Sequence, residues 1–293
     1  MVCLSGVLHA AVAGGVFAST GAPAPLPNSH CVRTSSGETI RAAPAATGVE
    51  WRLLRADQLR QAAAANPVVI LPVGSLEQHG PHLPVDVDSV LAEAVSRAAA
   101  LEMVCCGGAA LVLPTVWTGL SEHHMGLGGT ITLDFGAFTA VIRGICRSVA
   151  RHGFRRMALL NGHGGNEWAL RCVADDLTPA LGFPVVAFTY WSVAAAQVAG
   201  ILTRKRRLLH ACEAETSMML ALRPDLVDMA RAPPAVAAPD EGVGMHRWRT
   251  LESVSTGGTI GVPAAAMAET GVSLIAAVAN AVAEALLRPG LWE

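Results

Sequence analysis

Three short segments of this chain combine histidine with carboxylate side chains, a combination that binds divalent metals in enzymes. The segments are residues 77–88, 161–166 and 210–217, with the sequences EQHGPHLPVDVD, NGHGGN and HACEAETS. Imidazole nitrogens and carboxylate oxygens suit Zn, Mn and similar ions, and a set with spare carboxylates is more typical of a catalytic than of a structural site. Such a site makes water nucleophilic near neutral pH.

Apolar runs between these segments predict the elements that must position them. Short apolar runs predict buried strands, and longer Ala-rich stretches predict helices. The predicted strands are residues 67–73, 110–116, 156–160 and 184–190. The predicted helices are residues 89–101, 166–181, 213–222 and 263–287, with a further helix that starts at the cap Asp134 and runs to about 152. Because strands alternate with helices, we expect an α/β fold with a mostly parallel sheet covered by helices on both faces.

Two of the polar segments start where a predicted strand ends. Open α/β sheets place their sites at the carboxyl ends of strands, so these segments should share one edge of the sheet. Residues 118–124 follow the second strand and should line the same edge. Glu77 and His79 are two positions apart and therefore point the same way from an extended segment. The glycines around His163 permit a tight turn that projects its imidazole.

Each polar residue also has a structural interpretation. Asp88, at the start of a helix, is more often a cap than a ligand. His82 is a ligand or a loop histidine that supports its neighbours, and His123 and His124 line a cleft or are simply exposed. Glu213 is a further acid that a helix N-terminus favours. The coincidence of three clusters at one sheet edge favours the functional interpretation.

Together, the three motifs resemble the signature of the creatininase (creatinine amidohydrolase) family, and the resemblance covers residues 49–293. It implies a sandwich-like α/β/α fold and a site for two divalent ions per chain, Zn or Mn, with Fe as a further alternative. It also implies a homo-oligomer, often a hexamer. We expect residues 49–293 to form this one domain and residues 1–48 to be a poorly ordered extension.

The resemblance assigns roles by matching motif positions. One ion takes Glu77, Asp88 and His163, and the other takes His79, Asp88 and Glu215. Asp88 then bridges the two ions, and His210 matches the histidine that serves as proton shuttle. The expected reaction is metal-dependent hydrolysis of a C–N amide bond, cyclic or linear. A metal-bound hydroxide attacks the carbonyl, and His210 delivers a proton to the leaving nitrogen.

Departures from the family pattern bear on the substrate. Gly165 stands where creatininase proper has a glutamate, and Arg206 stands where it has a tryptophan near the substrate. We therefore expect creatinine to be a poor substrate. His123, Trp191 and Arg206 are the candidate substrate contacts. The basic run at 204–207 is either a solvated charge cluster or an entrance that attracts an anionic substrate.

Several alternatives to this function stay open. The chain could be a creatinine amidohydrolase proper, a peptidase of the mycofactocin-precursor type, a deformylase, or a non-catalytic metal-binding protein. The last needs no proton shuttle, so the presence of His210 argues against it.

Composition limits the remaining possibilities. The net charge is −2, which gives no electrostatic footprint for nucleic acid. Seven cysteines without a CxxC pair indicate reduced thiols in a cytoplasmic protein. Cys212 lies between two candidate residues, but the crowding carboxylates make it a poor candidate nucleophile. The apolar run near the N-terminus is too short and too rich in Gly and Ala for a membrane span, so we expect no membrane partner. With nucleic acid and membrane set aside, the expected partner is a small-molecule amide.

Overall fold

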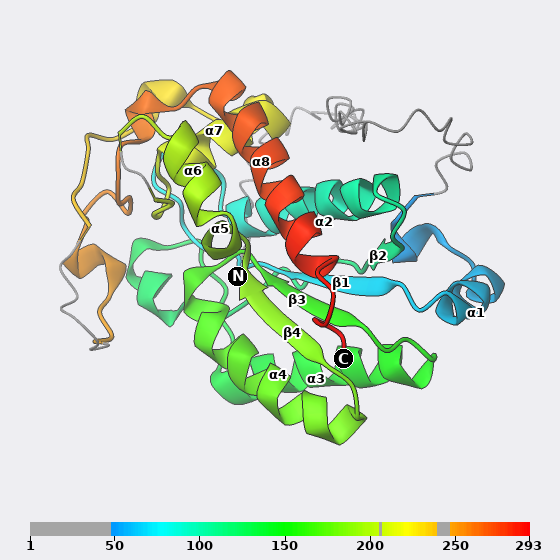
Figure 1. The fold of residues 1–293 in the computed structure, drawn as a ribbon. Helices are drawn as coiled ribbons and strands as arrows, with labels where there is room; N and C mark the ends of the chain where they lie inside the picture. The colour runs from blue at the N-terminus through cyan, green and yellow to red at the C-terminus, as the bar shows by residue number, and fades with distance from the viewer. Residues whose placement is uncertain (1–47, 205–206, 239–246) are drawn as a thin grey trace, which may run out of the picture.

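A four-stranded parallel sheet lies at the centre of the molecule (Figure 1). The computed structural model describes residues 48–204, 207–238 and 247–293. The strands are β1 (Val68–Val73), β2 (Ala110–Val112), β3 (Met157–Asn161) and β4 (Val185–Thr189), in the order β2-β1-β3-β4. All three pairings are parallel, which confirms the predicted sheet.

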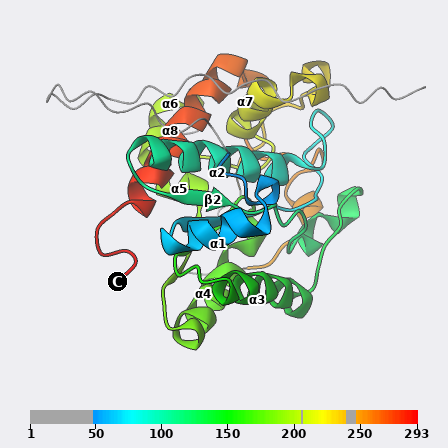
Figure 2. The same ribbon diagram turned by 90° about the vertical axis from the view of Figure 1, so that its right-hand side faces the viewer.

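Helices cover both faces of this sheet (Figures 1 and 2). One face carries α2 (Val87–Cys105), α5 (Tyr190–Val193), α6 (Ala195–Ile201), α7 (Glu213–Leu222) and α8 (Ala268–Leu286). The other face carries α1 (Ala56–Ala64), α3 (Phe135–Arg151) and α4 (Glu167–Leu181). Alternation along β1 divides the core, because Val68 and Ile70 join the first cluster while Val69 and Leu71 join the second.

Short 3₁₀ segments complete the described fold. They are η1 (Trp51–Leu53), η2 (Glu122–Leu127), η3 (Gly164–Asn166), η4 (Pro224–Leu226), η5 (Met229–Arg231), η6 (Leu251–Ser253) and η7 (Pro263–Ala265). The 3₁₀ segments and the helices α1, α5 and α6 were not predicted. Helix α1 has no buried residue, and it packs on the sheet through the partly buried Leu59, Ala62 and Ala63.

Several elements differ from their predicted bounds, among them α2, which was predicted at 89–101, and two of the differences have an identifiable cause. Strand β2 ends at Val112 instead of 116, because Pro114 has no N–H to donate and only an isolated bridge between Val73 and Val116 continues the pairing. The last helix starts at Ala268 and not at Pro263. The extended backbone of Met267 separates them, and its N–H donates to Ser217 Oγ at 3.1 Å.

Pairing between β1 and β3 places two of the polar segments side by side. Val73 lies opposite Asn161, so both chains leave the sheet at the same edge. Gly74 then passes close to α2, where a Cβ atom would lie 2.7 Å from Ser89 Cα. This close approach brings the first turn of α2 against the loop that follows β1. Asp134 caps α3 as predicted, and its Oδ1 accepts the Ala137 N–H at 2.8 Å.

Two sequence-based expectations concern the N-terminal part of the chain. The extension predicted for residues 1–48 lies outside the described residues except for Gly48, so it stays a prediction. The predicted domain boundary at residue 49 stays a prediction as well. Helix α8 is long and apolar enough, by length and composition, to cross a membrane. Its Leu274, Val278 and Val282 are buried in the core cluster, as in the core helix of a folded domain.

Candidate metal centre

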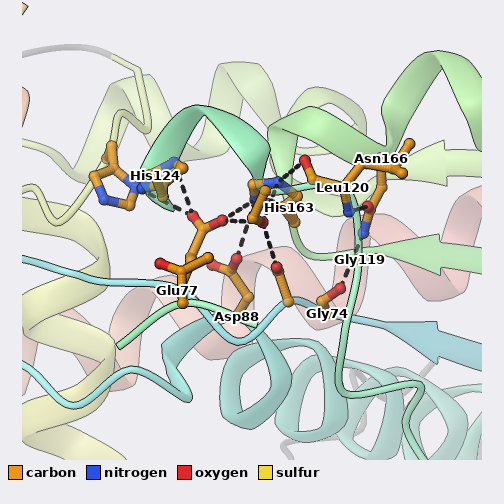
Figure 3. Close-up of polar contacts among 12 residues, drawn as sticks. Gly74, Glu77, Asp88, Gly119, Leu120, His124, His163 and Asn166 are labelled. Carbon is orange, nitrogen blue, oxygen red and sulfur yellow. Dashed lines mark hydrogen bonds and ion pairs between the residues drawn. The ribbon is translucent and has the colours of Figure 1, made fainter. Parts of the chain in front are cut away.

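Two buried triads of potential metal ligands meet at the carboxyl edge of the sheet. Figure 3 shows the first of them, Glu77, Asp88 and His163. Glu77 and His79 follow β1, His163 follows β3, and Asp88 and Glu215 lie in the first turns of α2 and α7. Within each triad the ligand atoms lie within 4.8 Å of one another, and the triads are Glu77, Asp88 and His163, and His79, Asp88 and Glu215. Both triads therefore share Asp88.

Each oxygen of Asp88 faces a different histidine. Oδ1 lies 3.2 Å from His79 Nε2, and Oδ2 lies 3.2 Å from His163 Nδ1. His163 Nδ1 is also 3.1 Å from Glu77 Oε2, and His79 Nε2 is 4.0 Å from Glu215 Oε2. This is the arrangement that a carboxylate needs to bridge two ions. Asp88 is not a helix cap, because it lies inside the first turn and Asp86 occupies the N-cap position.

Backbone carbonyls fix which nitrogen of each ring carries a proton. His79 Nδ1 lies 3.1 Å from Glu77 O, and His163 Nε2 lies 3.1 Å from Leu120 O. A carbonyl only accepts, so these nitrogens are protonated and the opposite nitrogen of each neutral ring is an unprotonated acceptor. That acceptor points at carboxylate oxygens. His79 Nε2 and Asp88 Oδ2 are buried and make no hydrogen bond within the described part of the chain, so the donor set fits a cation.

Without a cation, the buried carboxylates and rings compete for protons. Burial opposes the charged form of His79, but Asp88, Glu215 and Glu77 outweigh it and raise its pKa to about 9. Burial, reinforced by Asp88 and Glu77, raises the pKa of Glu215 to about 8. The pKa of Asp88 is lowered despite its burial, because His79 and His163 face it. Metal binding at this centre should therefore release protons.

His210 lies at the outer side of the centre, in the loop before α7. Its side chain is 15% exposed, whereas that of Glu77 is 1% exposed. Its Nε2 lies 2.9 Å from Gln78 O, and its Nδ1 lies 3.6 Å from Glu77 Oε1. Burial, together with His79 and His124, holds the pKa of His210 well below its ordinary value, so the ring is neutral. Its ring also forms a third group with Glu77 and His79, whose ligand atoms lie within 4.8 Å of one another.

The backbone next to His210 is held in an uncommon conformation. Ala211 has φ of 49°, in the left-handed region that costs a non-glycine residue about 1–2 kcal/mol. Its N–H donates to Glu215 Oε2 at 2.5 Å. This bond fixes both the position of His210 and the orientation of the Glu215 carboxylate.

Other polar residues of the same segments have structural roles. His82 is buried and lies outside both triads, and its Nε2 is 2.9 Å from Thr216 Oγ1. Glu213 accepts hydrogen bonds from the Thr203 N–H at 3.0 Å and the Arg204 N–H at 3.1 Å, which anchors the preceding loop to α7. Burial, with Glu215 nearby, raises the pKa of Cys212 to about 12, so its thiol is not an activated nucleophile.

The candidate substrate contacts lie in different environments. The His123 ring stacks on His163, with centroids 5.7 Å apart, so His123 adjoins the centre. Trp191, in α5, packs against the core cluster and makes an edge contact with Tyr190 at 4.9 Å. Arg206 lies outside the described residues. The substrate roles of all three stay predictions.

Four further polar residues support the ligands, a role that the sequence did not predict for them. Ser121 Oγ donates to Glu77 Oε2 at 2.5 Å, and His124 Nε2 lies 3.4 Å from Glu77 Oε1. Asn166 joins two loops, because its Oδ1 accepts the Leu120 N–H and its Nδ2 donates to Gly74 O, both at 2.9 Å (Figure 3). Gln78 is the fourth. Asn166 is the last residue of the NGHGGN motif, and this motif was the sequence signal that could have identified it. Ser121 and His124 lie 44 and 47 positions beyond Glu77, so no local pattern connects them with it.

Gly165 has no room for a side chain in this arrangement. A Cβ atom there would overlap with Leu120 O and His163 Nε2, and would lie 3.1 Å from His123 Cε1. The packing around His163 therefore requires glycine at this position.

Comparisons with known proteins agree with this geometry. The family model described as "Creatininase: Creatinine amidohydrolase" matches residues 52–286. The creatinine amidohydrolase of Pseudomonas putida is 32% identical over 246 residues, covering 76% of this chain and 90% of the relative. A mycofactocin precursor peptide peptidase from Mycobacterium ulcerans (strain Agy99) is 34% identical over 215 residues, covering 72% of this chain and 80% of the relative. Solved structures of a creatininase with Mn and of a Zn–Zn mutant form have TM-scores of 0.69 and 0.67 at 30% identity, covering 82% of this chain and 97% of theirs.

Proposed function

The chain belongs to the creatininase family, and on that premise we propose that it hydrolyses C–N amide bonds at a centre of two divalent metal ions. The observation that carries the proposal is the position of Asp88, whose two oxygens face unprotonated nitrogens of two different histidines. Glu77, Asp88 and His163 would hold one ion, and His79, Asp88 and Glu215 the other. When bound, such a pair of ions polarises a carbonyl group and lowers the pKa of water between them.

Residues of the chain itself handle the proton in this proposal. His210 is neutral, donates its Nε2 proton to Gln78 O, and faces the centre with Nδ1. Nδ1 can therefore accept a proton during attack on the carbonyl and donate it to the leaving nitrogen. Ser121 and His124 hold the two oxygens of Glu77 and so preserve the shape of the centre.

We propose that the substrate is a small amide other than creatinine. Gly165 cannot carry the glutamate of creatininase proper, and Arg206 replaces its tryptophan, so the substrate contacts differ although the ligand set is complete. His123, beside His163, is the best placed of the candidate contacts, with Trp191 and Arg206 as further candidates. The basic run at 204–207 favours an anionic group on the substrate.

Cleavage of a precursor peptide is the second candidate. A relative named as a mycofactocin precursor peptide peptidase covers a large part of this chain. Both candidates break a C–N amide bond with the same centre, and they differ only in the size of the group that must enter. A deformylase or a non-catalytic metal-binding protein is a more distant alternative.

The remaining properties of the proposed enzyme follow from its relatives and composition. We expect Zn or Mn, with Fe as a third choice, because structures of related creatininases are described with Mn and with two Zn ions. A homo-oligomer, with a hexamer as one alternative, and a cytoplasmic location without nucleic-acid or membrane partners are further parts of the proposal.

A panel of amides tests the proposal. The protein is loaded with Zn or Mn, and the hydrolysis product is measured for each amide: the ring-opened acid for creatinine and lactams, and the released amine or ammonia for N-formyl compounds and short peptide amides. We expect turnover of at least one amide that chelation abolishes, with creatinine slower than the best substrate. Creatinine as the best substrate would contradict the specificity, and two bound ions without any turnover would favour the non-catalytic alternative.

A further inference from the structure

Gln78 lies between two histidines that approach the same oxygen of Glu77. Its Nε2 is 3.0 Å from His124 Nδ1, 3.1 Å from His210 Nε2 and 3.2 Å from Gly258 O. Its Oε1 accepts the Gly80 N–H at 2.9 Å. The side chain is buried, and it belongs to neither metal-ligand triad.

The orientation of the Gln78 amide follows from its backbone partners. The Gly80 N–H only donates, so it must meet the amide oxygen, and Gly258 O only accepts, so it must meet the amide nitrogen. Gly258 has φ of 66°, and a Cβ atom there would overlap with Gln78 Oε1, so the loop can approach this closely only with glycine. One amide proton therefore goes to Gly258 O, and a single proton remains for the two histidines.

The main chain of Gln78 decides which histidine receives that proton. His210 Nε2 lies 2.9 Å from Gln78 O, and a carbonyl can only accept, so this nitrogen carries a proton and cannot accept another. The second amide proton then goes to His124 Nδ1. The neutral His124 ring must carry its own proton on Nε2, which lies 3.4 Å from Glu77 Oε1.

The two histidines therefore present opposite groups to Glu77 Oε1. His124 presents an N–H, which can hold the carboxylate, while His210 presents the acceptor Nδ1 at 3.6 Å. We propose that Gln78 is a positioning residue that sets both tautomers, His124 through its side chain and His210 through its backbone carbonyl. This inference rests on the proposed function only in giving His210 the proton-transfer role. It also assigns His124 as a support for Glu77 and not as an additional metal ligand.

The proposal explains why a neutral amide occupies this position. An ionised glutamate would have no proton to donate, so His124 would have to protonate Nδ1 and turn an unprotonated Nε2 toward the Glu77 carboxylate. A methionine would remove the donor to His124 Nδ1 and leave only the longer 3.4 Å contact with Glu77 Oε1 to favour its Nε2 tautomer, but it would keep the backbone carbonyl that fixes His210. Gln78→Met should therefore affect the two rings differently, which a general loss of packing would not do.

Neutron diffraction from crystals of the full chain, zinc-loaded and after chelation, tests the assignment directly. In the wild type we expect deuterium on Nε2 of both His124 and His210. In Gln78→Met we expect His210 to be unchanged and His124 to lose exclusive Nε2 occupancy. Deuterium on His124 Nδ1 in the wild type, or an unchanged His124 in the variant, would overturn the proposal. If Gln78→Met does not fold, the wild-type neutron map tests the proposal together with Gln78→Glu, in which we expect deuterium on Nδ1 of His124.

Kinetics give a second readout on whichever amide the panel identifies. We expect Gln78→Met to retain metal and to lower kcat by about 10- to 100-fold, the usual effect of losing a partner that orients a ligand, with a smaller change in KM. Gln58→Met is the matched control, because Gln58 makes the same kind of amide contact, to the Arg55 N–H, on an exposed helix. An equal loss in both variants would overturn the positioning role. The neutron result stands even if no amide is hydrolysed, so it separates this inference from the proposed function.

Discussion

Asp88 Oδ1 lies 3.2 Å from His79 Nε2, a buried nitrogen whose ring is already protonated on the other side. A carboxylate oxygen and an imidazole lone pair repel each other unless a proton or a cation lies between them. Asp88 lies in the first turn of α2 and His79 in the loop after β1. The fold therefore holds these two groups at a distance that requires a proton or a cation between them.

Metal content should depend on Asp88 more than on any other single ligand. Asp88→Asn replaces one oxygen by an amide nitrogen and removes the negative charge of the carboxylate that both triads share, so we expect it to reduce the content of both ions, whereas Glu77→Gln should reduce the content of one. Elemental analysis after dialysis measures this. Asp86→Asn is the matched control, since Asp86 lies two positions away and belongs to neither triad. Full occupancy in Asp88→Asn would refute the bridging assignment.

His210 should be separable from the ligands. We expect His210→Ala to keep both ions and to lower kcat by about 10²- to 10⁴-fold, the usual range for a lost general acid–base group. Metal analysis and steady-state kinetics on the same preparation check both parts. His152→Ala, on an exposed residue at the end of α3, serves as the control. If His210→Ala loses an ion, His210 is a ligand with Glu77 and His79.

Stability of the chelated protein should fall as the pH rises from about 6.5 to about 9. The pKa of His79 is raised to about 9 and that of Glu215 to about 8, so the folded metal-free protein binds more protons than the unfolded chain in this range. A group with a raised pKa stabilises the fold below its unfolded pKa, and this contribution is lost as the pH passes its folded pKa. Thermal unfolding in chelator at several pH values measures the effect.

Added zinc should raise the Tm more at pH 9 than at pH 6.5, because the ions then no longer compete with protons. A Tm of the chelated protein that rises over this range would show that these groups do not share protons as described.

Gly165 should tolerate no side chain. Gly165→Ala would push Cβ into Leu120 O and His163 Nε2, so we expect weaker binding of the ion that His163 holds and lower activity. Gly164→Ala is the matched control, since a Cβ atom there meets nothing within 4 Å. Metal titration of the two variants distinguishes them. Equal affinity in both would mean that the loop around His163 relaxes easily.

Local sequence patterns predicted the elements that position the site. Helix α7 has the predicted bounds 213–222, and Asp134 caps α3 as expected, because caps and apolar runs are local signals. The start of α8 was predicted wrongly, since it depends on a hydrogen bond from Met267 to Ser217 across the fold. The sequence favoured a cap role for Asp88, because nothing local reveals that two distant histidines face it.

The supporting contacts of the site were beyond sequence reasoning for the same reason. Gln78 contacts Gly258 O across 180 positions, and Ser121 reaches Glu77 across 44. Only the packing of the loops onto the sheet edge brings these groups together. The motifs therefore predict which residues could bind metal, and the fold determines which nitrogen or oxygen of each residue faces the centre.

Anomalous diffraction at the zinc absorption edge, from crystals of the zinc-loaded full chain, tests the central claim most directly. We predict two anomalous peaks per chain, one bonded by Glu77, Asp88 and His163 and the other by His79, Asp88 and Glu215, with one oxygen of Asp88 at each peak or one shared between them. A single peak, or a peak bonded by His210 with Glu77 and His79, would contradict the account.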